Sequence, residues 1–331
     1  MNKPLISILM SCYNAQKWLN ESIESVLNQT YKYFEFIIID DGSNDNTWDI
    51  IIIYSKKDCR IIPIKKENTG LTDSLNYGLK IAHGKWVARI DADDYWEKIR
   101  LEKQIEYIKK HPEVVLLGTA CQAINKNGSF TKKCFYPSSH TILVHNIKYS
   151  KKYFPHSSAF INKNALEKVG YYNTFFKKAQ DKDLWLRLSN VGKIACIKKC
   201  YVKIRKHENQ ISKNFSGKPQ YVYGLAASVA YVIRELEKED PSVNKDKYLW
   251  LNFLEWIEKK SIIDKLPQRN KIWNDARLKY YASNNKIIGL VRFFLEITKL
   301  RGQICKLILE KIFGTMLHKS LAHQWIKNNK C

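Results

Sequence analysis

Three carboxylates lie within four positions of the chain, at Asp91, Asp93 and Asp94, directly after a short apolar run. Like charges crowded in this way repel one another, so a purely structural role gives little reason for them. Asp91 and Asp93 are two residues apart, and in an extended segment both carboxylates point the same way. Paired carboxylates bind hard cations, with water and phosphate oxygens filling the remaining positions. We therefore predict an Mg²⁺ or Mn²⁺ site. The alternative is a solvated turn in which one aspartate caps a helix that begins near Tyr95 or Trp96.

A second polar cluster, Asp40–Ser43, follows another apolar run. Aspartate and glycine are typical of a turn, and Ser43 or Asn44 could cap the next helix. That interpretation needs only one of the two aspartates, so the other carboxylate could accept a hydrogen bond from a nucleobase N–H or a ribose hydroxyl. The first apolar run is followed by SCYNAQKW, without the glycines of a dinucleotide-binding loop, and the P-loop pattern is also missing. Phosphate is therefore predicted to be held through a metal ion on the aspartates.

Five apolar runs in the first 120 residues are predicted to be strands, with helical patterns between them. Their near-continuous apolar character is typical of a parallel sheet that is covered on both faces. The alternation predicts a doubly wound α/β domain, in which ligands bind beyond the carboxyl ends of the strands. Polar clusters follow the first, second and fourth runs, which is where such ligands bind. The predicted strands are 5–11, 34–40, 60–64, 85–91 and 114–120, and the helical stripes run over 18–27 and 71–79.

The pattern changes beyond the fifth predicted strand. Asn127–Gly128 predicts a hairpin turn, and 164–170 and 181–192 predict two short helices that each end at a glycine. Residues 193–207 alternate enough to form a strand. From about residue 220 the sequence is helical and basic.

The composition favours a globular protein with anionic partners. The 331 residues are 45% hydrophobic and carry 56 Lys or Arg against 32 Asp or Glu, a formal net charge of +24. Such an excess favours phosphorylated ligands, nucleic acid or an acidic membrane face. The eight cysteines contain no CxxC pair, and free thiols without a secretory signal indicate a reducing cytoplasm. Every apolar stretch is shorter than the roughly 18 residues that a membrane span requires.

A basic segment lies near the end of the chain. The segment from Lys286 to Lys330 contains nine Lys or Arg but only two Glu, and its apolar residues recur at helical spacing. One interpretation is an ordinary helix that packs on its own domain. The other is a basic amphipathic surface that lies on an anionic membrane leaflet. The second interpretation predicts a peripheral protein on the inner face of the cytoplasmic membrane.

Five motifs occur in one order along the chain: ISILMSCYN (6–14), IIIDDGSNDNT (37–47), ENTGLTDSLNYGLKIAHGKWVARIDADD (67–94), AQDKDLWLRL (179–188) and IRKHENQIS (204–212). Together they resemble the family-2 inverting glycosyltransferases with the GT-A fold, of the type that builds bacterial surface polysaccharides. The resemblance covers about residues 3 to 215. It implies a GT-A domain over 1–218, followed by a helical basic region over 219–331.

The resemblance implies a donor site for a nucleotide-sugar, and it favours UDP as the nucleotide. Asp41 is then the partner of the base N–H, and Asp93 is the main metal ligand. Asp91 faces the same site through ribose or metal-bound water, and His207 completes the metal site or touches the diphosphate. Arg205 meets a phosphate or flanks a strand end. The donor-binding residues implied in this way are Ser11, Tyr13, Asp41, Asn68, Gly70, Asp91 and Arg205, and the metal-binding residues are Asp93, Asp91 and His207.

An inverting transfer needs a base that takes the proton of the acceptor hydroxyl. The resemblance places this base at Asp181, where Gln180 stands in place of the glutamate that usually precedes it. The alternative is that Asp181 caps the helix and Asp183 is an anion of its first turn. The residues implied on the acceptor side are His156, Asp183 and Trp185.

We therefore predict a metal-dependent inverting glycosyltransferase. Its acceptor is a bacterial surface glycan or lipid-linked precursor, such as lipopolysaccharide, O-antigen or capsule. The missing QxxRW motif and the missing membrane spans argue against a processive synthase. A basic nucleic-acid-binding protein and a catalytically inactive assembly partner remain as alternatives. The acidic site argues against the first, because it would repel a phosphate backbone, and the intact aspartates argue against the second.

Overall fold

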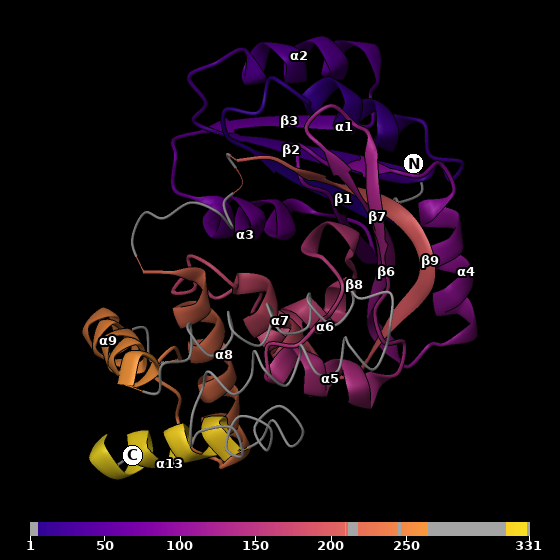
Figure 1. The fold of residues 1–331 in the computed structure, drawn as a ribbon. Helices are drawn as coiled ribbons and strands as arrows, with labels where there is room; N and C mark the ends of the chain where they lie inside the picture. Colours follow the sequence, from indigo (N-terminus) through magenta and orange to yellow (C-terminus); the bar gives the residue numbers. More distant parts are fainter. Residues whose placement is uncertain (1–5, 209, 211–217, 244–245, 264–315, 330–331) are drawn as a thin grey trace, which may run out of the picture. The chain divides into compact units, whose positions relative to one another are not determined.

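The computed structural model describes residues 6–208, 210, 218–243, 246–263 and 316–329 (Figure 1). The chain divides into two compact units, Met1–Gln220 and Tyr221–Cys331. Most of the basic segment between Lys286 and Lys330 lies outside the described residues, so the structure tests its predicted helices only over 316–329.

The first unit is built on a nine-stranded sheet with the order β3-β2-β1-β4-β8-β6-β9-β5, and β7 pairs with β6 outside this path. Strands β1 to β4 pair in parallel, as their apolar runs predict. The antiparallel strand β8 lies between β4 and β6, so β6 again runs in the direction of β4. The strands are β1 Ile6–Cys12, β2 Phe34–Asp41, β3 Ile61–Lys66, β4 Trp86–Arg89, β5 Tyr95–Trp96, β6 Val114–Asn125, β7 Phe130–Cys134, β8 Phe160–Asn162 and β9 Lys193–Lys206.

Helices cover both faces of the parallel strands, with α1 and α2 on one face and α3 on the other (Figure 1). The helices are α1 Leu19–Leu27, α2 Thr47–Lys57, α3 Leu71–Ile81, α4 Arg100–Lys110, α5 His140–Lys148, α6 Lys163–Val169 and α7 Gln180–Leu188, with a 3-10 turn η1 at His156–Ser158. The predicted α/β architecture is confirmed. The sheet is mixed rather than purely parallel, because short antiparallel strands join its two halves.

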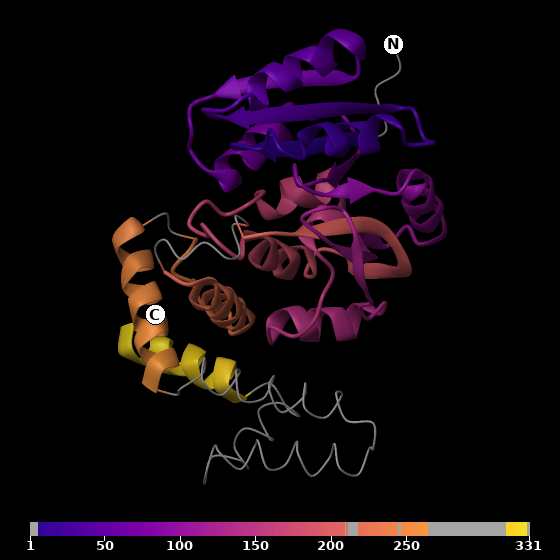
Figure 2. The same ribbon diagram turned by 45° about the horizontal axis from the view of Figure 1, so that its top comes forward.

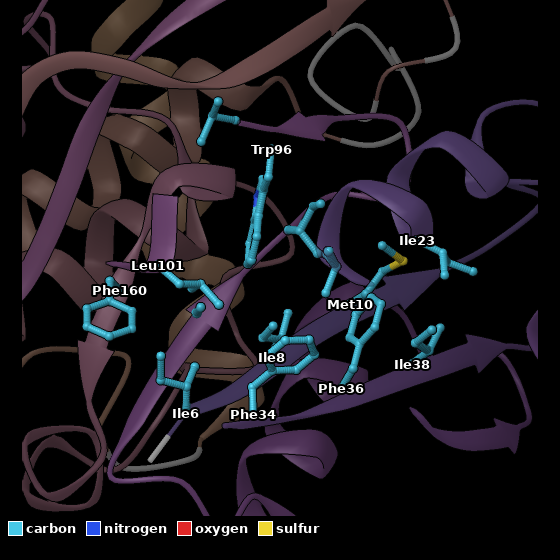
Figure 3. Close-up of a cluster of buried hydrophobic side chains, with 14 of the residues drawn as sticks. Ile6, Ile8, Met10, Ile23, Phe34, Phe36, Ile38, Trp96, Leu101 and Phe160 are labelled. Atoms are coloured by element: carbon cyan, nitrogen blue, oxygen red, sulfur yellow. The ribbon is translucent and has the colours of Figure 1, made fainter. Parts of the chain in front are cut away.

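The core follows the two-residue alternation of the strands. Ile8 and Met10 of β1 point to the same face as Phe36 of β2, where they pack with Ile23 of α1 (Figure 3). Leu9 points to the opposite face, where α3 approaches so closely that a Cβ on one of its glycines would lie 2.2 Å from the Leu9 side chain. Because both faces are covered, the polar ends of the strands are the places where ligands can reach the sheet.

Two predicted helix boundaries are wrong. Residues Tyr95 and Trp96 form strand β5 against β9, and the next helix begins only at Arg100. Helix α7 ends at Leu188 rather than at Gly192. Gly192 is needed for packing instead, since a Cβ there would lie 2.3 Å from the side chain of Val115.

Other local predictions are confirmed. Helix α6 ends at Gly170, which has the left-handed φ of 79° that favours glycine at this position. Strands β6 and β7 form the predicted hairpin, and the backbone N–H of Asn125 donates to the carbonyl of Ser129 across it. The cysteines within the described residues are free thiols.

The second unit is helical where it is described. Helix α8 spans Gln220–Glu235, α9 spans Lys247–Ile263 and α13 spans Met316–Asn329. Helices α9 and α13 share an aromatic core in which the Phe253 and Trp325 rings lie 4.8 Å apart (Figure 2). In the part of the chain that the structure describes, every helix is too short or too polar to cross a membrane.

A substitution at Gly118 of β6 tests how tightly the sheet packs against the segment that carries Phe154. A Cβ at this position would lie 2.1 Å from the ring of Phe154. We expect Gly118→Ala to lower the free energy of unfolding by about 1 to 3 kcal/mol, because an overpacked core must shift backbone or rotamers. Urea denaturation measures this effect. The matched control is Gly224→Ala in α8, where an added Cβ would lie more than 4 Å from the other described residues, its own helix backbone aside. A Gly118→Ala variant as stable as the wild type would contradict the packing described here.

Candidate active site

The three carboxylates of the acidic turn, Asp91, Asp93 and Asp94, converge at the carboxyl end of β4. Their ligand oxygens lie within 4.8 Å of one another. The segment is a turn rather than the extended strand end predicted from the spacing, since the backbone N–H of Asp94 donates to the carbonyl of Asp91 at 3.1 Å. The convergence is therefore produced by the chain reversal and not by strand alternation.

The turn separates the three aspartates by environment. Asp94 is buried, and its carboxylate accepts the backbone N–H of Arg205 at 3.0 Å. Burial, followed by repulsion from Asp93 and Asp91, raises the pKa of Asp94 well above its usual value. The side chains of Asp91 and Asp93 are 39% and 25% exposed. Asp94 thus fixes the turn, and the other two carboxylates remain accessible to a ligand.

His207 lies against Asp93, as the resemblance implies. Its Nε2 is 2.7 Å from the Asp93 carboxylate, and its ring lies 4.4 Å from the ring of Trp18. Burial and the charge of Asp91 raise the pKa of Asp93, although the hydrogen bond from His207 partly opposes the shift. The structure therefore brings together Asp91, Asp93 and His207.

Arg205 does not fit the predicted contact with a donor phosphate. Its side chain is only 2% exposed, and its guanidinium is held by protein acceptors. Nε donates to the carbonyl of Asp93 at 3.0 Å and Nη2 donates to Glu21 at 2.6 Å. Arg205 thus positions the acidic turn from behind.

Arg89 is a site residue that the sequence analysis missed. This last residue of β4 is fully buried and forms an ion pair with Asp91. Within the described residues, its Nε and Nη2 have no hydrogen-bond partner. The signal was an arginine inside an otherwise apolar run, directly before a group of carboxylates. Arg89 places a buried positive charge under the acidic turn.

Asp41 lies in a cradle of donors at the end of β2, which β1 separates from β4 in the sheet. Its carboxylate accepts the backbone N–H of Thr69 at 3.1 Å and that of Gly70 at 2.9 Å, and it forms an ion pair with Lys66. Burial alone would raise the pKa of Asp41, but these hydrogen bonds and the Lys66 charge outweigh it and lower the pKa. Asp41 is therefore an ionised hydrogen-bond acceptor, the property expected of the residue predicted to bind the nucleobase.

The rest of the DDGS cluster forms the turn. Asp40 accepts the backbone N–H of Ser43 at 3.1 Å. Neither Ser43 nor Asn44 caps α2, whose N-cap is Asn46, so that prediction is wrong. The loop that carries Asn68 packs closely on this turn, because a Cβ at Gly42 would lie 2.8 Å from the Asn68 nitrogen. Ser11 and Tyr13 come from the end of β1, and the Tyr13 side chain is exposed.

Asp181 lies in the first turn of α7. The N-cap is Ala179, which has no side-chain cap, so the alternative that Asp181 caps the helix is wrong. Burial raises the pKa of Asp181, and the positive charge of Arg89 only partly offsets this. The charge of Arg89, which pairs with Asp91, thus also acts on Asp181.

The predicted acceptor residues are less accessible than expected. Asp183 is buried and accepts Nε of Arg187 at 2.9 Å, and Trp185 is fully buried. His156 lies 5.6 Å from the Trp185 ring, and its Nε2 is 2.6 Å from the Tyr172 hydroxyl. Burial, together with the charge of Arg89, lowers the pKa of His156 well below its usual value. Asp183 and Trp185 therefore support α7 from inside, and the prediction that they contact the acceptor does not fit the structure.

Comparisons with known proteins identify the family. Residues 7–170 match the model of glycosyl transferase family 2. The uncharacterized glycosyltransferase MJ1057 of Methanocaldococcus jannaschii is 35% identical over 265 residues, which are 76% of this chain and 86% of that protein. The chain belongs to glycosyl transferase family 2. The predicted enzyme class, a glycosyltransferase, is thereby confirmed.

Other matches agree with this family and fold. The putative teichuronic acid biosynthesis glycosyltransferase TuaG of Bacillus subtilis is 30% identical over 239 residues, or 71% of this chain and 90% of that protein. Among solved structures, S. aureus TarS in complex with UDP-GlcNAc superposes with a TM-score of 0.61 at 19% identity, over 98% of this chain and 92% of that chain. This likeness supports the GT-A fold of the family-2 enzyme.

Lys182, directly after Asp181, gives a pH-dependent test of this site. Burial lowers the pKa of Lys182 to about 7, although Asp181 opposes the shift. Above that pH the folded enzyme binds fewer protons than the unfolded chain, up to the ordinary lysine pKa of about 10.4. The free energy of unfolding should therefore rise with pH in this window, by at most about 1.4 kcal/mol per pH unit from this group.

Urea denaturation of Lys182→Met at several pH values from 7 upward checks this expectation. The free energy of unfolding should rise less with pH in the variant than in the wild type, because the variant lacks the titrating amine. Lys177→Met, on an exposed lysine five residues earlier, is the matched control. Equal increases in Lys182→Met and in the wild type would show that the amine does not carry the effect.

Proposed function

We propose that this family-2 enzyme is a metal-dependent inverting transferase that moves a sugar from a UDP-sugar to a hydroxyl of a surface polysaccharide or its lipid-linked precursor. One observation carries the proposal. Two accessible carboxylates, Asp91 and Asp93, converge after the carboxyl end of β4, and an ionised acceptor, Asp41, lies at the carboxyl end of β2, two strands along the parallel part of the sheet.

The donor nucleoside is proposed to bind between the ends of β1 and β2. The Asp41 side chain is only 4% exposed, and its Oδ2 accepts the Gly70 N–H. Since a carboxylate oxygen can accept more than one hydrogen bond, we propose that Asp41 also accepts the N–H of the nucleobase. Ser11 and Tyr13, at the end of β1, are proposed to line one side of the nucleoside site. The loop with Asn68 and Gly70 is proposed to line the other side. The complexes of TarS with UDP and UDP-GlcNAc support uridine as the donor nucleoside.

The acidic turn fits a divalent cation. Its donor set consists of carboxylate oxygens, which Mg²⁺ and Mn²⁺ prefer, and His207 stands next to Asp93. The raised pKa values of Asp93 and Asp94 reflect burial and negative charges held close together. When bound, the cation would neutralise charge that develops on the leaving diphosphate. Asp91 and Asp93 are the residues proposed to hold it.

Asp181 is proposed to be the general base. It accepts the proton of the acceptor hydroxyl while the hydroxyl oxygen attacks the anomeric carbon. The bond from that carbon to the diphosphate oxygen breaks, and the nucleoside diphosphate leaves with the electron pair. Attack from the opposite face inverts the anomeric centre. Burial raises the pKa of Asp181 toward the working pH, which suits a base that must also release its proton.

The acceptor class and the cellular location belong to the same proposal. TuaG is named for teichuronic acid biosynthesis, which supports a surface polysaccharide as the acceptor here. The excess of basic residues between Lys286 and Lys330 supports a peripheral location on the inner face of the cytoplasmic membrane, through contacts with anionic lipid headgroups. Most of that segment lies outside the described residues.

Asp93→Asn tests the metal site without measuring turnover. We expect UDP to bind the wild type much more tightly with Mn²⁺ than without it. In Asp93→Asn, the affinity for UDP in the presence of Mn²⁺ should fall by about 100-fold or more. Calorimetric titration of UDP with and without Mn²⁺ measures both. Glu113→Gln is the control, because Glu113 precedes the amino end of β6, whereas the acidic turn follows the carboxyl end of β4, which runs in the same direction. UDP binding that is indifferent to Mn²⁺ in the wild type would reject the metal-dependent site.

Asp181→Asn tests the base. The variant should bind UDP and Mn²⁺ as the wild type does, since Asp181 is proposed to act on the acceptor rather than on the donor. Sugar transfer should fall by about 10² to 10⁴-fold, because an amide cannot accept the proton. Product formation from UDP-sugars, followed by chromatography, gives the rate. Near-normal transfer by Asp181→Asn would mean that another group is the base.

A further inference from the structure

Trp18 occupies a position that the local rules of helix formation do not explain. It is the N-cap residue of α1, and its side chain makes no capping hydrogen bond. Short polar side chains are preferred there, because their oxygens accept the free N–H groups of the first helical turn. An indole has only an N–H donor and cannot do this. Since departures from local rules are expected at functional sites, the contacts of this ring carry information.

The indole is anchored at the end of β6. Its Nε1 donates to the backbone carbonyl of Lys126 at 3.2 Å, across a sequence separation of 108 residues. Nη1 of Arg205 donates to the same carbonyl at 3.4 Å, and the guanidinium carbon lies 5.5 Å from the centre of the Trp18 ring. The ring is thus held by the turn between β6 and β7 and lies next to the arginine that positions the acidic turn.

The anchored ring lies against His207. The centres of the two rings are 4.4 Å apart, and their planes are inclined by 38°. Nε2 of the same imidazole is 2.7 Å from the Asp93 carboxylate. The residue before His207, Lys206, pairs with Asn125 at the end of β6, so His207 and the anchor of Trp18 are placed by the same strand end. The imidazole is therefore in contact with an aromatic ring and with a carboxylate of the acidic turn.

His207 lacks the second hydrogen bond that usually orients a metal-binding histidine. Such histidines almost always donate their other ring N–H to a carboxylate, a carbonyl or water, which fixes the plane of the ring. Nδ1 of His207 is buried and has no hydrogen-bond partner within the described residues. Its side chain is 11% exposed, so little of the ring is open to solvent. The flat face of Trp18 is then the contact that can fix the ring plane.

We propose that Trp18 is a positioning residue of the cation site. Its ring holds the imidazole of His207 beside Asp93, so that His207 joins Asp91 and Asp93 in binding the divalent cation. This inference rests on the proposed function and extends its cation site beyond the acidic turn. A ligand side chain that is already held in place loses less conformational freedom on binding, and the cation therefore binds more tightly.

The experiment measures binding rather than turnover. UDP is titrated calorimetrically into the full chain, once with Mn²⁺ and once with EDTA, and the ratio of the two affinities is the gain that the cation provides. We expect Trp18→Ala to reduce this gain by about 10-fold, since loss of a residue that orients a metal ligand costs about 10- to 100-fold in metal affinity. The affinity for UDP in EDTA should stay unchanged. Trp18→Phe should keep most of the gain, because a phenyl ring still offers a flat face to His207.

A double-mutant cycle tests whether Trp18 acts through His207. His207→Ala should reduce the gain at least as much as Trp18→Ala does, and the double variant should lose no more than His207→Ala alone. The matched control is Trp86→Ala, which removes a partly buried tryptophan that stacks on Phe160 at 4.9 Å. Trp86 begins β4, at the strand end opposite the acidic turn, so this variant should keep the full gain. Urea denaturation checks that each variant is folded, and Trp18→Leu replaces Trp18→Ala if that variant does not fold.

The outcomes separate this inference from the proposed function. A wild type whose affinity for UDP is indifferent to Mn²⁺ contradicts the proposed cation site, and the inference falls with it. If Asp93→Asn loses the gain but Trp18→Ala keeps it, the inference is overturned while the proposed function stands. The inference is also overturned if the losses in Trp18→Ala and His207→Ala add in the double variant, because Trp18 would then act independently of His207. An equal loss of UDP affinity in EDTA overturns it too, since Trp18 would then bind the nucleotide directly.

Discussion

The crowding of negative charge at the end of β4 is the constraint around which the first unit is arranged. Carboxylates with their oxygens within 4.8 Å of one another repel, and burial of one of them adds a desolvation cost. The fold compensates with fixed positive charge and oriented donors. Arg89 pairs with Asp91 from below, and Arg205 supplies its backbone N–H to Asp94. The acidic turn is thus held in a shape that it would not keep by itself.

Buried guanidinium groups make this arrangement possible. Arg100 is fully buried, stacks on Trp96 at 3.7 Å and donates to the carbonyl of Ser157 at 2.9 Å. The hydroxyl of that same Ser157 accepts the backbone N–H of Asp91 at 3.1 Å. Arginine suits this role because its planar group can serve several acceptors at once. A chain of polar contacts therefore joins α4, the η1 turn and the acidic turn through the interior.

The same organisation gives the two sides of the site different electrostatic character. On the proposed donor side, hydrogen bonds and the Lys66 charge outweigh burial and lower the pKa of Asp41. On the other side, burial dominates and raises the pKa of Asp181. Two carboxylates of one chain thus acquire opposite tendencies from their surroundings, which is how a fold can separate ligand binding from proton transfer.

The sequence by itself determined the α/β class, the parallel strands and the positions of the polar clusters, because alternating apolar runs and turn residues are local properties of the chain. It also led to Asp41, Asp93 and His207 through motifs in a recognisable order. Only the tertiary structure showed that Arg205 is enclosed, that Asp183 and Trp185 face inward, and that Arg89 lies under the acidic turn. Arg205 meets Asp93 and Glu21 across sequence separations of 112 and 184 residues. The burial of Asp183, Trp185 and Arg89 depends on which elements pack around them, a relation that spacing along the sequence does not contain.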